Sequence, residues 1–227
     1  MGLLGSFKGW MGESAIAAGL WMKLDDSVYR RIHNVIVPAQ NGTTQIDHVL
    51  VSVFGIFVVE TKDRDGWIFG APDQPKWTQV QHGKKYQFQN PLRQNYRHTK
   101  CLSEYLGLDH DLFHSVVIFT GESEFKTPMP ENVLDRGLSR YIESFVERLL
   151  TEDQVEEIAR TLRSLKESSG FSKSDHLDSL RERHGSTTQC PRCGGSLVRR
   201  TAKQGSHAGQ EFLGCSNYPR CRYTKGT

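Results

Sequence analysis

Apolar residues gather in short runs along the first two thirds of the chain, and these runs predict strands. Residues 44–52 and 55–62 are nearly continuous valine, isoleucine and phenylalanine, and they join at Val53 and Phe54. Runs that are apolar at successive positions are typical of strands covered on both faces, in the centre of a sheet. Three more apolar runs are predicted as strands, at residues 32–38, 67–70 and 115–120.

A helical period of apolar residues precedes and follows these strands. It predicts helices over residues 13–24, 90–107, 138–149 and 152–167. Asn90 and Pro91 suit the start of the second helix, and Thr151-x-x-Gln154 forms a capping box before the last one. The resulting order is α-β-β-β-α-β with helical additions, which predicts a mixed α/β layered core.

Polar composition then indicates how the chain is divided. From residue 168 to 189 the apolar content falls, while serine, lysine and glycine become frequent, as in a linker. We therefore expect a larger domain over residues 1–167, with its core at about 12–125, and a small module over 190–227.

The charge of the chain follows the same division. The net charge of the 227 residues is only +3, but residues 186–227 hold seven lysines and arginines against one acidic residue. Residues 1–185 then carry a net charge of −3. A basic C-terminal module indicates an anionic partner for that module.

Hydropathy and cysteine usage indicate a cytoplasmic protein with no membrane partner. No stretch approaches the roughly 18–20 apolar residues of a membrane span, and the opening segment lacks the basic region of a signal peptide. Four of the five cysteines fall in the last 38 residues, which disfavours a disulfide framework spread along the chain. Cys101, within a predicted helix, is expected to be a small buried residue.

The four C-terminal cysteines have the spacing of a zinc site. A C-x2-C pair is followed after 21 residues by a C-x5-C pair, formed by Cys190, Cys193, Cys215 and Cys221. Two such pairs, joined by a hairpin-length spacer, can place four thiolates around one Zn²⁺, which would stabilise a module with a very small core. The alternative is two disulfides, which a chain without an export signal disfavours.

The same segment resembles the C4 zinc ribbon of type IA DNA topoisomerases, in its CPRCGG, LVRR, FLGCSNYP and CRYT sequences. The resemblance implies binding of nucleic acid, as those ribbons bind single-stranded DNA. Basic side chains that can contact phosphates and a tyrosine on which a base can stack agree with it. The expected contact residues are Arg199, Arg200, Lys203, Tyr218, Arg220 and Arg222. Phe212 and Tyr223 have two interpretations, as stacking platforms or as the core of the ribbon.

Two carboxylates and a lysine are predicted to converge on the hairpin of residues 44–62. A turn centred between Val53 and Phe54 places Asp47 opposite Glu60, and Lys62 shares their face by alternation. Such a charge cluster on an apolar hairpin is costly unless it is compensated, and carboxylate oxygens suit Mg²⁺. The alternative is a set of surface salt bridges near the strand ends. His48 points to the opposite face and is expected to be a packed core histidine.

This hairpin resembles the core of PD-(D/E)xK nucleases, and residues 12–125 resemble the nuclease-related domain, NERD. The likeness rests on Gly12-Glu13, on QIDHVLVSVFGIFVVETK (45–62), on NPLRQNYRH (90–98) and on SVVIFT. It implies a restriction-endonuclease-like fold with Asp47 and Glu60 as ligands of Mg²⁺ or Mn²⁺. It further implies that Lys62 orients the attacking water.

The resemblance extends to two further positions, each with an alternative explanation. The resemblance places Glu13 at a position that completes the metal site, whereas a plain helix-terminal glutamate is the alternative. It also implies that Gln94, with His98 one turn later, contacts the site or the DNA backbone. Arg93, Arg97 and Lys100 on the same helix suit phosphates or a solvated basic face.

The function expected from these features is a metal-dependent nuclease that acts on DNA, with a zinc ribbon that holds the substrate. The main alternative is a nucleic-acid-binding adaptor that retains the nuclease fold without catalysis, and a third is a topoisomerase accessory. A homodimer and a helicase partner stay open, because no residue decides them.

Overall fold

The computed structural model describes residues 24–39, 42–168, 186–191, 195–204 and 208–226. The predicted helix at 13–24 therefore lies almost wholly outside the described residues. The chain divides into two compact units, residues 1–37 with 45–169 and residues 38–44 with 170–227.

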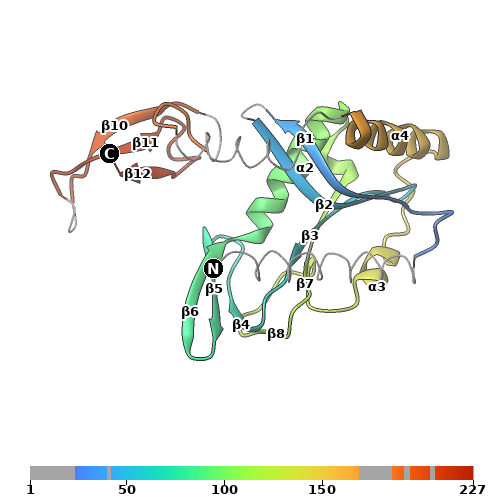
Figure 1. Cartoon of the computed structure of the whole chain (residues 1–227), viewed down its shortest axis with the longest axis horizontal. Coiled ribbons are helices and arrows are strands. Elements are labelled where there is room, and N and C mark those ends of the chain that lie inside the picture. The colour runs from blue at the N-terminus through green and yellow to red at the C-terminus, as the bar shows by residue number, and fades with distance from the viewer. Residues whose placement is uncertain (1–23, 40–41, 169–185, 192–194, 205–207, 227) are drawn as a thin grey trace. The chain divides into compact units, whose positions relative to one another are not determined.

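A five-stranded sheet forms the centre of the first unit (Figure 1). Its strands lie in the order β1 (Arg30–Ala39), β2 (Gly42–Ser52), β3 (Gly55–Lys62), β7 (Phe113–Phe119) and β9 (Val133–Leu134). Strands β2 and β3 are antiparallel, whereas β3, β7 and β9 run parallel. The expected mixed α/β fold is therefore present.

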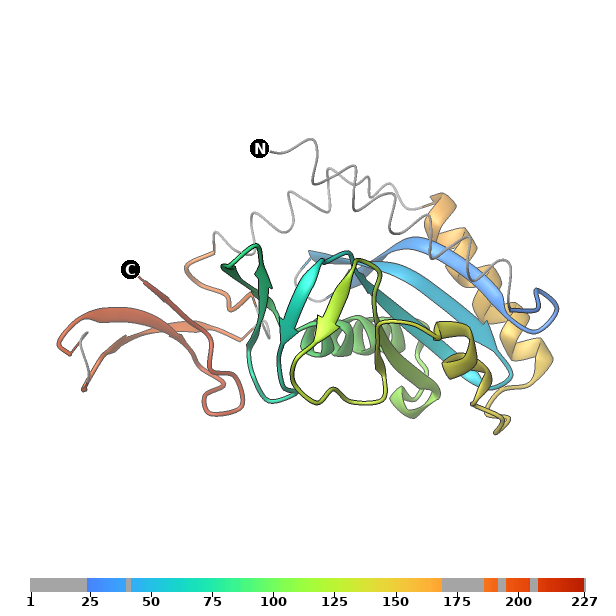
Figure 2. The same ribbon diagram turned by 90° about the horizontal axis from the view of Figure 1, so that it is seen from below.

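Helices and loops cover both faces of this sheet, which explains the continuous apolar runs. Val49, Val51, Ile56 and Val58 pack on one face with helices α2 (Pro91–Leu106) and α4 (Glu152–Ser168). The intervening residues of β2 and β3 pack on the other face with Ile142 of α3 (Leu138–Glu143). Figure 2 shows α2 and α4 along the sheet.

The helix ends follow the sequence signals in two of the predicted helices. The Asn90 side chain accepts a hydrogen bond from the Leu92 amide at the start of α2, and Gly107 ends that helix with φ of 65°. At the start of α4, Thr151 and Gln154 exchange the two hydrogen bonds of a capping box. No described helix combines the length and apolarity needed to cross a bilayer.

Two expectations about this part of the chain are wrong. The helix predicted at 138–149 ends at Glu143, because the amides of Leu149 and Leu150 donate instead to the Val53 carbonyl at the β2–β3 turn. Cys101 is only partly buried. It lies beside the buried stripe of α2, in which Leu102 takes the core position.

A second sheet, which the apolar pattern predicts only in part, lies in the same unit. Its order is β6 (Lys84–Gln89), β5 (Lys76–Gln81), β4 (Gly66–Phe69) and β8 (Ser123–Phe125), of which the sequence predicts only β4. Strands β5 and β6 form a hairpin whose two turn residues, His82 and Gly83, both have positive φ, as a type I′ turn requires. The short helix η1 (His110–Leu112) precedes β7.

The second unit is a three-stranded antiparallel sheet with a very small core. Its strands are β10 (Leu197–Thr201), β11 (Glu211–Cys215) and β12 (Thr224–Gly226), in that order. Leu197 and Leu213 are buried there together with three cysteines. An apolar core of this size contributes little stability, so the module needs a crosslink or a metal.

Candidate functional site

The candidate catalytic cluster lies where β3 ends. The β2–β3 ladder has the register that the turn position predicts, and its last pair is His48 with Val59. Asp47 and Glu60 are therefore the next residues beyond the paired ladder. Alternation along β3 turns Glu60 and Lys62 toward α2, the helix that packs with Ile56 and Val58 on that face.

Glu60 is buried and is held by three side chains. Its Oε1 lies 2.5 Å from Lys62 Nζ and 2.7 Å from Gln94 Nε2, and its Oε2 lies 3.2 Å from His98 Nε2. Lys62 Nζ also donates to Gln94 Oε1 at 3.0 Å, which closes the network. Glu60 is only 3% exposed, so an exposed surface salt bridge does not describe it.

The network fixes the charge of Glu60. Burial raises the pKa of Glu60, but the hydrogen bond from His98 and the nearby charge of Lys62 outweigh burial, so the pKa lies below its ordinary value. The carboxylate therefore stays ionised. His98 donates to Glu60 through Nε2, and that nitrogen then has no lone pair for the Gln94 amide 3.4 Å away.

Helix α2 is fixed against the sheet by a residue with no recognisable sequence signal. The Asn95 side chain is fully buried and donates to the carbonyls of Val58 and Val116, on two neighbouring strands. Gln94 and His98 flank Asn95 on the same helix, so this anchor sets their distance from Glu60. The one-turn spacing of Gln94 and His98 reveals them in the sequence, whereas nothing there reveals Asn95.

Asp47 lies on β2 beside the end of β3, and its contact differs from those of Glu60. Its Oδ2 accepts a hydrogen bond of 3.0 Å from the backbone amide of Thr61, and its side chain is partly exposed. Asp47 therefore takes the place of a ladder carbonyl opposite β3 and keeps carboxylate oxygen near the end of the strand. Glu13, the third acidic candidate, lies outside the described residues.

His48 is a buried residue, as expected. Its Nδ1 lies 2.8 Å from Nδ1 of His33, and it is 1% exposed. Burial is the main reason that the pKa of His48 falls to about 4, and the neighbouring His33 lowers it further. The buried His48 ring, packed edge-on against His33, is therefore a core side chain.

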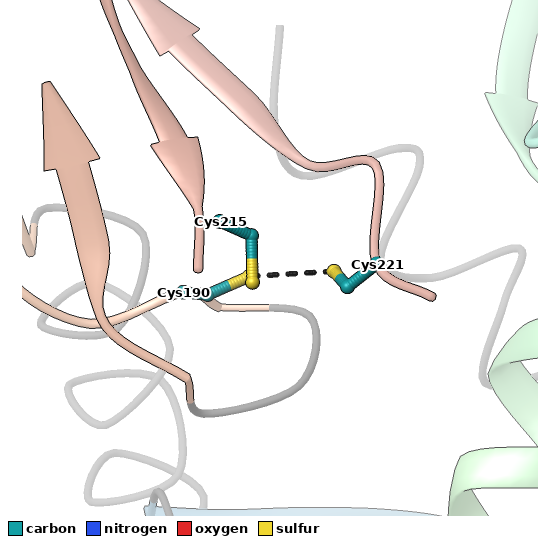
Figure 3. Close-up of side chains that lie close together, drawn as sticks. All are labelled: Cys190, Cys215 and Cys221. Carbon is teal, nitrogen blue, oxygen red and sulfur yellow. Dashed lines mark hydrogen bonds between the residues drawn. The ribbon is translucent and has the colours of Figure 1, made fainter. Parts of the chain in front are cut away.

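Three cysteines converge in the second unit (Figure 3). The thiols of Cys190, Cys215 and Cys221 are buried, and Cys190 Sγ lies 3.7 Å from Cys221 Sγ. A disulfide would bring two sulfurs to about 2 Å, whereas two thiolates on one Zn²⁺ lie just under 4 Å apart. The amide of Asn217 also donates to Cys215 Sγ. The donor set therefore fits Zn²⁺, and Cys193 lies outside the described residues.

The predicted nucleic-acid contacts of the ribbon are exposed. Tyr218 is 59% exposed, and the Arg200 guanidinium lies 5.8 Å from the centre of its ring. Arg199 forms an exposed ion pair with Glu211 on the neighbouring strand. Lys203, Arg220 and Arg222 are exposed as well. Tyr223 packs against the cysteine core, which favours its interpretation as a core residue.

Comparisons with known proteins agree with this division. The model of the nuclease-related domain matches residues 8–120, and that of the topoisomerase DNA binding C4 zinc finger matches residues 187–227. An uncharacterised protein of Bacillus anthracis is 38% identical over 162 residues, which cover 69% of this chain and 76% of that protein.

Two DNA topoisomerases resemble the ribbon alone. DNA topoisomerase 1 of Helicobacter pylori is 47% identical over 45 residues, 19% of this chain and 5% of that enzyme. DNA topoisomerase 1 of Archaeoglobus fulgidus is 56% identical over 36 residues, 16% of this chain and 5% of that enzyme.

One solved structure, of a protein of unknown function, covers 78% of this chain and 98% of its own, with a TM-score of 0.29 and 14% identity. That similarity is too weak to support any argument. The matches over residues 8–120 and 187–227 and the Bacillus anthracis relative show that the chain belongs to the nuclease-related domain family and carries a topoisomerase-type C4 zinc ribbon.

Proposed function

We propose that this protein is a metal-dependent nuclease that hydrolyses phosphodiester bonds in DNA. The observation that carries the proposal is the buried Glu60 carboxylate, held by Lys62 two residues later, with Asp47 on β2 beside the end of β3. This arrangement supports a restriction-endonuclease-like core. The break between the two compact units after residue 169 and the ribbon match over 187–227 support the assignment of residues 1–167 as nuclease domain, 168–189 as linker and 190–227 as zinc ribbon.

Asp47 and Glu60 would hold Mg²⁺ or Mn²⁺, because carboxylate oxygens are the ligands that these ions prefer. The bound ion would neutralise phosphate charge and supply an acidified water molecule. Glu13 is a further candidate ligand on sequence grounds alone.

Lys62 has a separate role in this proposal. Its ammonium group contacts Glu60 and Gln94 in the described cluster. A phosphate oxygen of the substrate would compete for the same protons, so Lys62 would stabilise charge on the phosphate and orient the water beside it. Gln94 would keep the ammonium group of Lys62 in place. The Zn²⁺-bound ribbon would have a separate role, because it would keep DNA near the nuclease domain.

The test is cleavage of labelled single-stranded, double-stranded and forked DNA, and of RNA, with Mg²⁺, Mn²⁺ or neither. We expect wild-type protein to cut DNA only with metal. Lys62→Ala and Glu60→Gln should lose at least a hundredfold in rate, the order that removal of one preorganised charged group costs. Lys166→Ala, which removes an exposed lysine on α4, should cut normally.

Metal-independent cutting, or equal rates in all four proteins, would contradict the proposal. One observation favours a second function, a nucleic-acid-binding adaptor without catalysis. Protein groups already bond both carboxylate oxygens of Glu60, so the cluster is satisfied without a metal. Calorimetric titration with Mn²⁺ separates the two functions. A nuclease should bind Mn²⁺ in a way that Asp47→Ala abolishes, whereas an adaptor should show no such binding.

A further inference from the structure

The nuclease-related unit contains a basic segment that the proposed catalytic cluster does not use. Residues 74–103 include six lysines and arginines and no aspartate or glutamate, although residues 1–185 carry a net charge of −3. This segment comprises the β5–β6 hairpin and most of α2. A local concentration of one charge in a unit of the opposite sign indicates an anionic ligand.

Side chains of the hairpin are available to such a ligand. Strand β6 lies at the edge of the second sheet, and Phe88 is its one buried residue. Lys84, Lys85 and Tyr86 follow the turn and are exposed, Tyr86 by 47%. Figure 1 shows the hairpin projecting past the start of α2. Proteins bind single-stranded nucleic acid with positively charged groups and with exposed aromatic rings on which bases stack.

Contacts connect this hairpin to the strand end that carries Lys62. Arg64, two residues after Lys62, donates to Gln79 Oε1 on β5 at 2.7 Å, and its guanidinium lies 4.1 Å from the centre of the Phe88 ring. Gln79 is the cross-strand partner of Tyr86, so both side chains lie on one face of the hairpin. Lys84 shares that face by alternation, whereas Lys85 points to the opposite face.

The base of the hairpin is also fixed. The Asn90 side chain is fully buried and donates to the carbonyls of Ala71, Pro72 and Gln74, while its oxygen caps α2. The hairpin therefore has a defined position relative to Gln94 and the cluster around Glu60.

We propose that the β5–β6 hairpin binds a single-stranded segment of nucleic acid, with a phosphate on Lys84 and a base stacked on Tyr86. The inference deepens the proposed function, because it gives the nuclease domain its own contact with the substrate, separate from the ribbon. Lysines on an edge strand also hinder pairing with other strands, and that role alone predicts no effect on nucleic-acid binding.

The experiment measures binding of full-length protein to a short labelled oligothymidylate by fluorescence anisotropy, over a range of salt concentrations, without Mg²⁺ or Mn²⁺. Lys84→Gln should lower the magnitude of the slope of log K against log salt by about 0.7, the contribution of one phosphate that is no longer neutralised. Arg160→Gln, which removes the same charge from the exposed side of α4, should leave the slope unchanged.

The aromatic contact has its own pair of variants. Tyr86→Leu should weaken binding about 5- to 150-fold, the range for loss of one stacked base. Tyr86→Phe should bind as wild type does, because it keeps the ring. A slope for Lys84→Gln equal to that of Arg160→Gln, or wild-type affinity for Tyr86→Leu, would overturn the inference.

Failure of the hairpin inference and failure of the proposed nuclease are distinguishable. The binding assay contains no metal for catalysis, and the ribbon is the same in every variant. A reduced slope in a protein that never cuts DNA would support the hairpin surface and count against the nuclease. Normal binding by all hairpin variants, with cutting abolished by Lys62→Ala, would overturn the hairpin surface and leave the nuclease standing.

Discussion

At the scale of single residues, Glu60 shows how this fold tolerates a buried charge. An ionised carboxylate with 3% exposure is costly without compensation. Here Lys62 supplies opposite charge, while Gln94 and His98 supply hydrogen bonds. These contacts compensate the buried charge without a metal. Whether the cluster also catalyses cleavage is a separate question, which the cleavage assays decide.

Asp47 is expected to have a structural role that can be separated from metal binding. Asp47→Ala should lower the free energy of unfolding by about 1–2 kcal/mol, because the Thr61 amide loses its acceptor. Asp47→Asn should cost less, because its amide oxygen can accept the same bond. Urea unfolding of both variants checks this expectation. Equal stabilities would show that the hydrogen bond contributes nothing measurable.

His114 is expected to make the protein sensitive to acid. Burial lowers the pKa of His114 below 6.5, and this outweighs the bond to the Phe54 carbonyl, which raises it. The unfolded chain then binds more protons, so stability falls as the pH drops below about 6.5. His114→Gln should flatten the dependence of the unfolding midpoint on pH as the pH falls below about 6.5. A slope as steep as that of wild type would refute this assignment.

Sequence reasoning finds the centre of the candidate cluster but not its supports. Alternation along two apolar strands predicts Asp47, Glu60 and Lys62 on one face, and in the structure Lys62 contacts Glu60 while Asp47 accepts from the Thr61 amide. Asn95 cannot be found in this way, because an asparagine that bonds two strand carbonyls from a helix depends on the tertiary packing of that helix. The Thr61 amide that holds Asp47 belongs to the backbone and leaves no signal in the sequence.

At the scale of elements, Asn90 connects the β5–β6 hairpin to α2. Asn90→Ala should lower the free energy of unfolding by about 3 kcal/mol, because three carbonyls and the helix start lose their partner. Asn90→Asp keeps the capping oxygen but buries a carboxylate against the same three carbonyl oxygens, so it should cost at least as much as Asn90→Ala. Chemical unfolding measures both values. A harmless Asn90→Ala would show that water replaces these bonds.

The β5–β6 hairpin escapes sequence prediction for two physical reasons. Most side chains of β6 are polar and exposed, so the strand lacks the apolar alternation that reveals a half-buried strand. The turn uses His82 in the left-handed region, where asparagine or glycine is typical of a type I′ turn. Longer, covered elements such as β2, β3, α2 and α4 are predictable because burial and caps dictate their sequences.

At the scale of the whole molecule, the two units are expected to respond differently to loss of zinc. A thiol-reactive reagent should release one Zn²⁺ per chain. Cys215→Ser should likewise lose the Zn²⁺ or bind it more weakly. The ribbon should then unfold, because its core contains little besides the cysteines and two leucines. The unfolding midpoint of the first unit should stay unchanged, which differential scanning calorimetry can measure. Loss of both transitions together would contradict this independence.

The position of α4 has a consequence for how this protein is divided. The match to the nuclease-related domain ends at residue 120, yet α4 covers one face of β1, β2 and β3 with Val155, Ile158 and Leu162. A fragment cut at the boundary of the match would leave that face bare, and large exposed apolar surfaces promote aggregation. The segment that the family model matches and the segment that packs as one unit are therefore of different lengths. A soluble fragment of the first unit would have to extend to the end of α4, at Ser168.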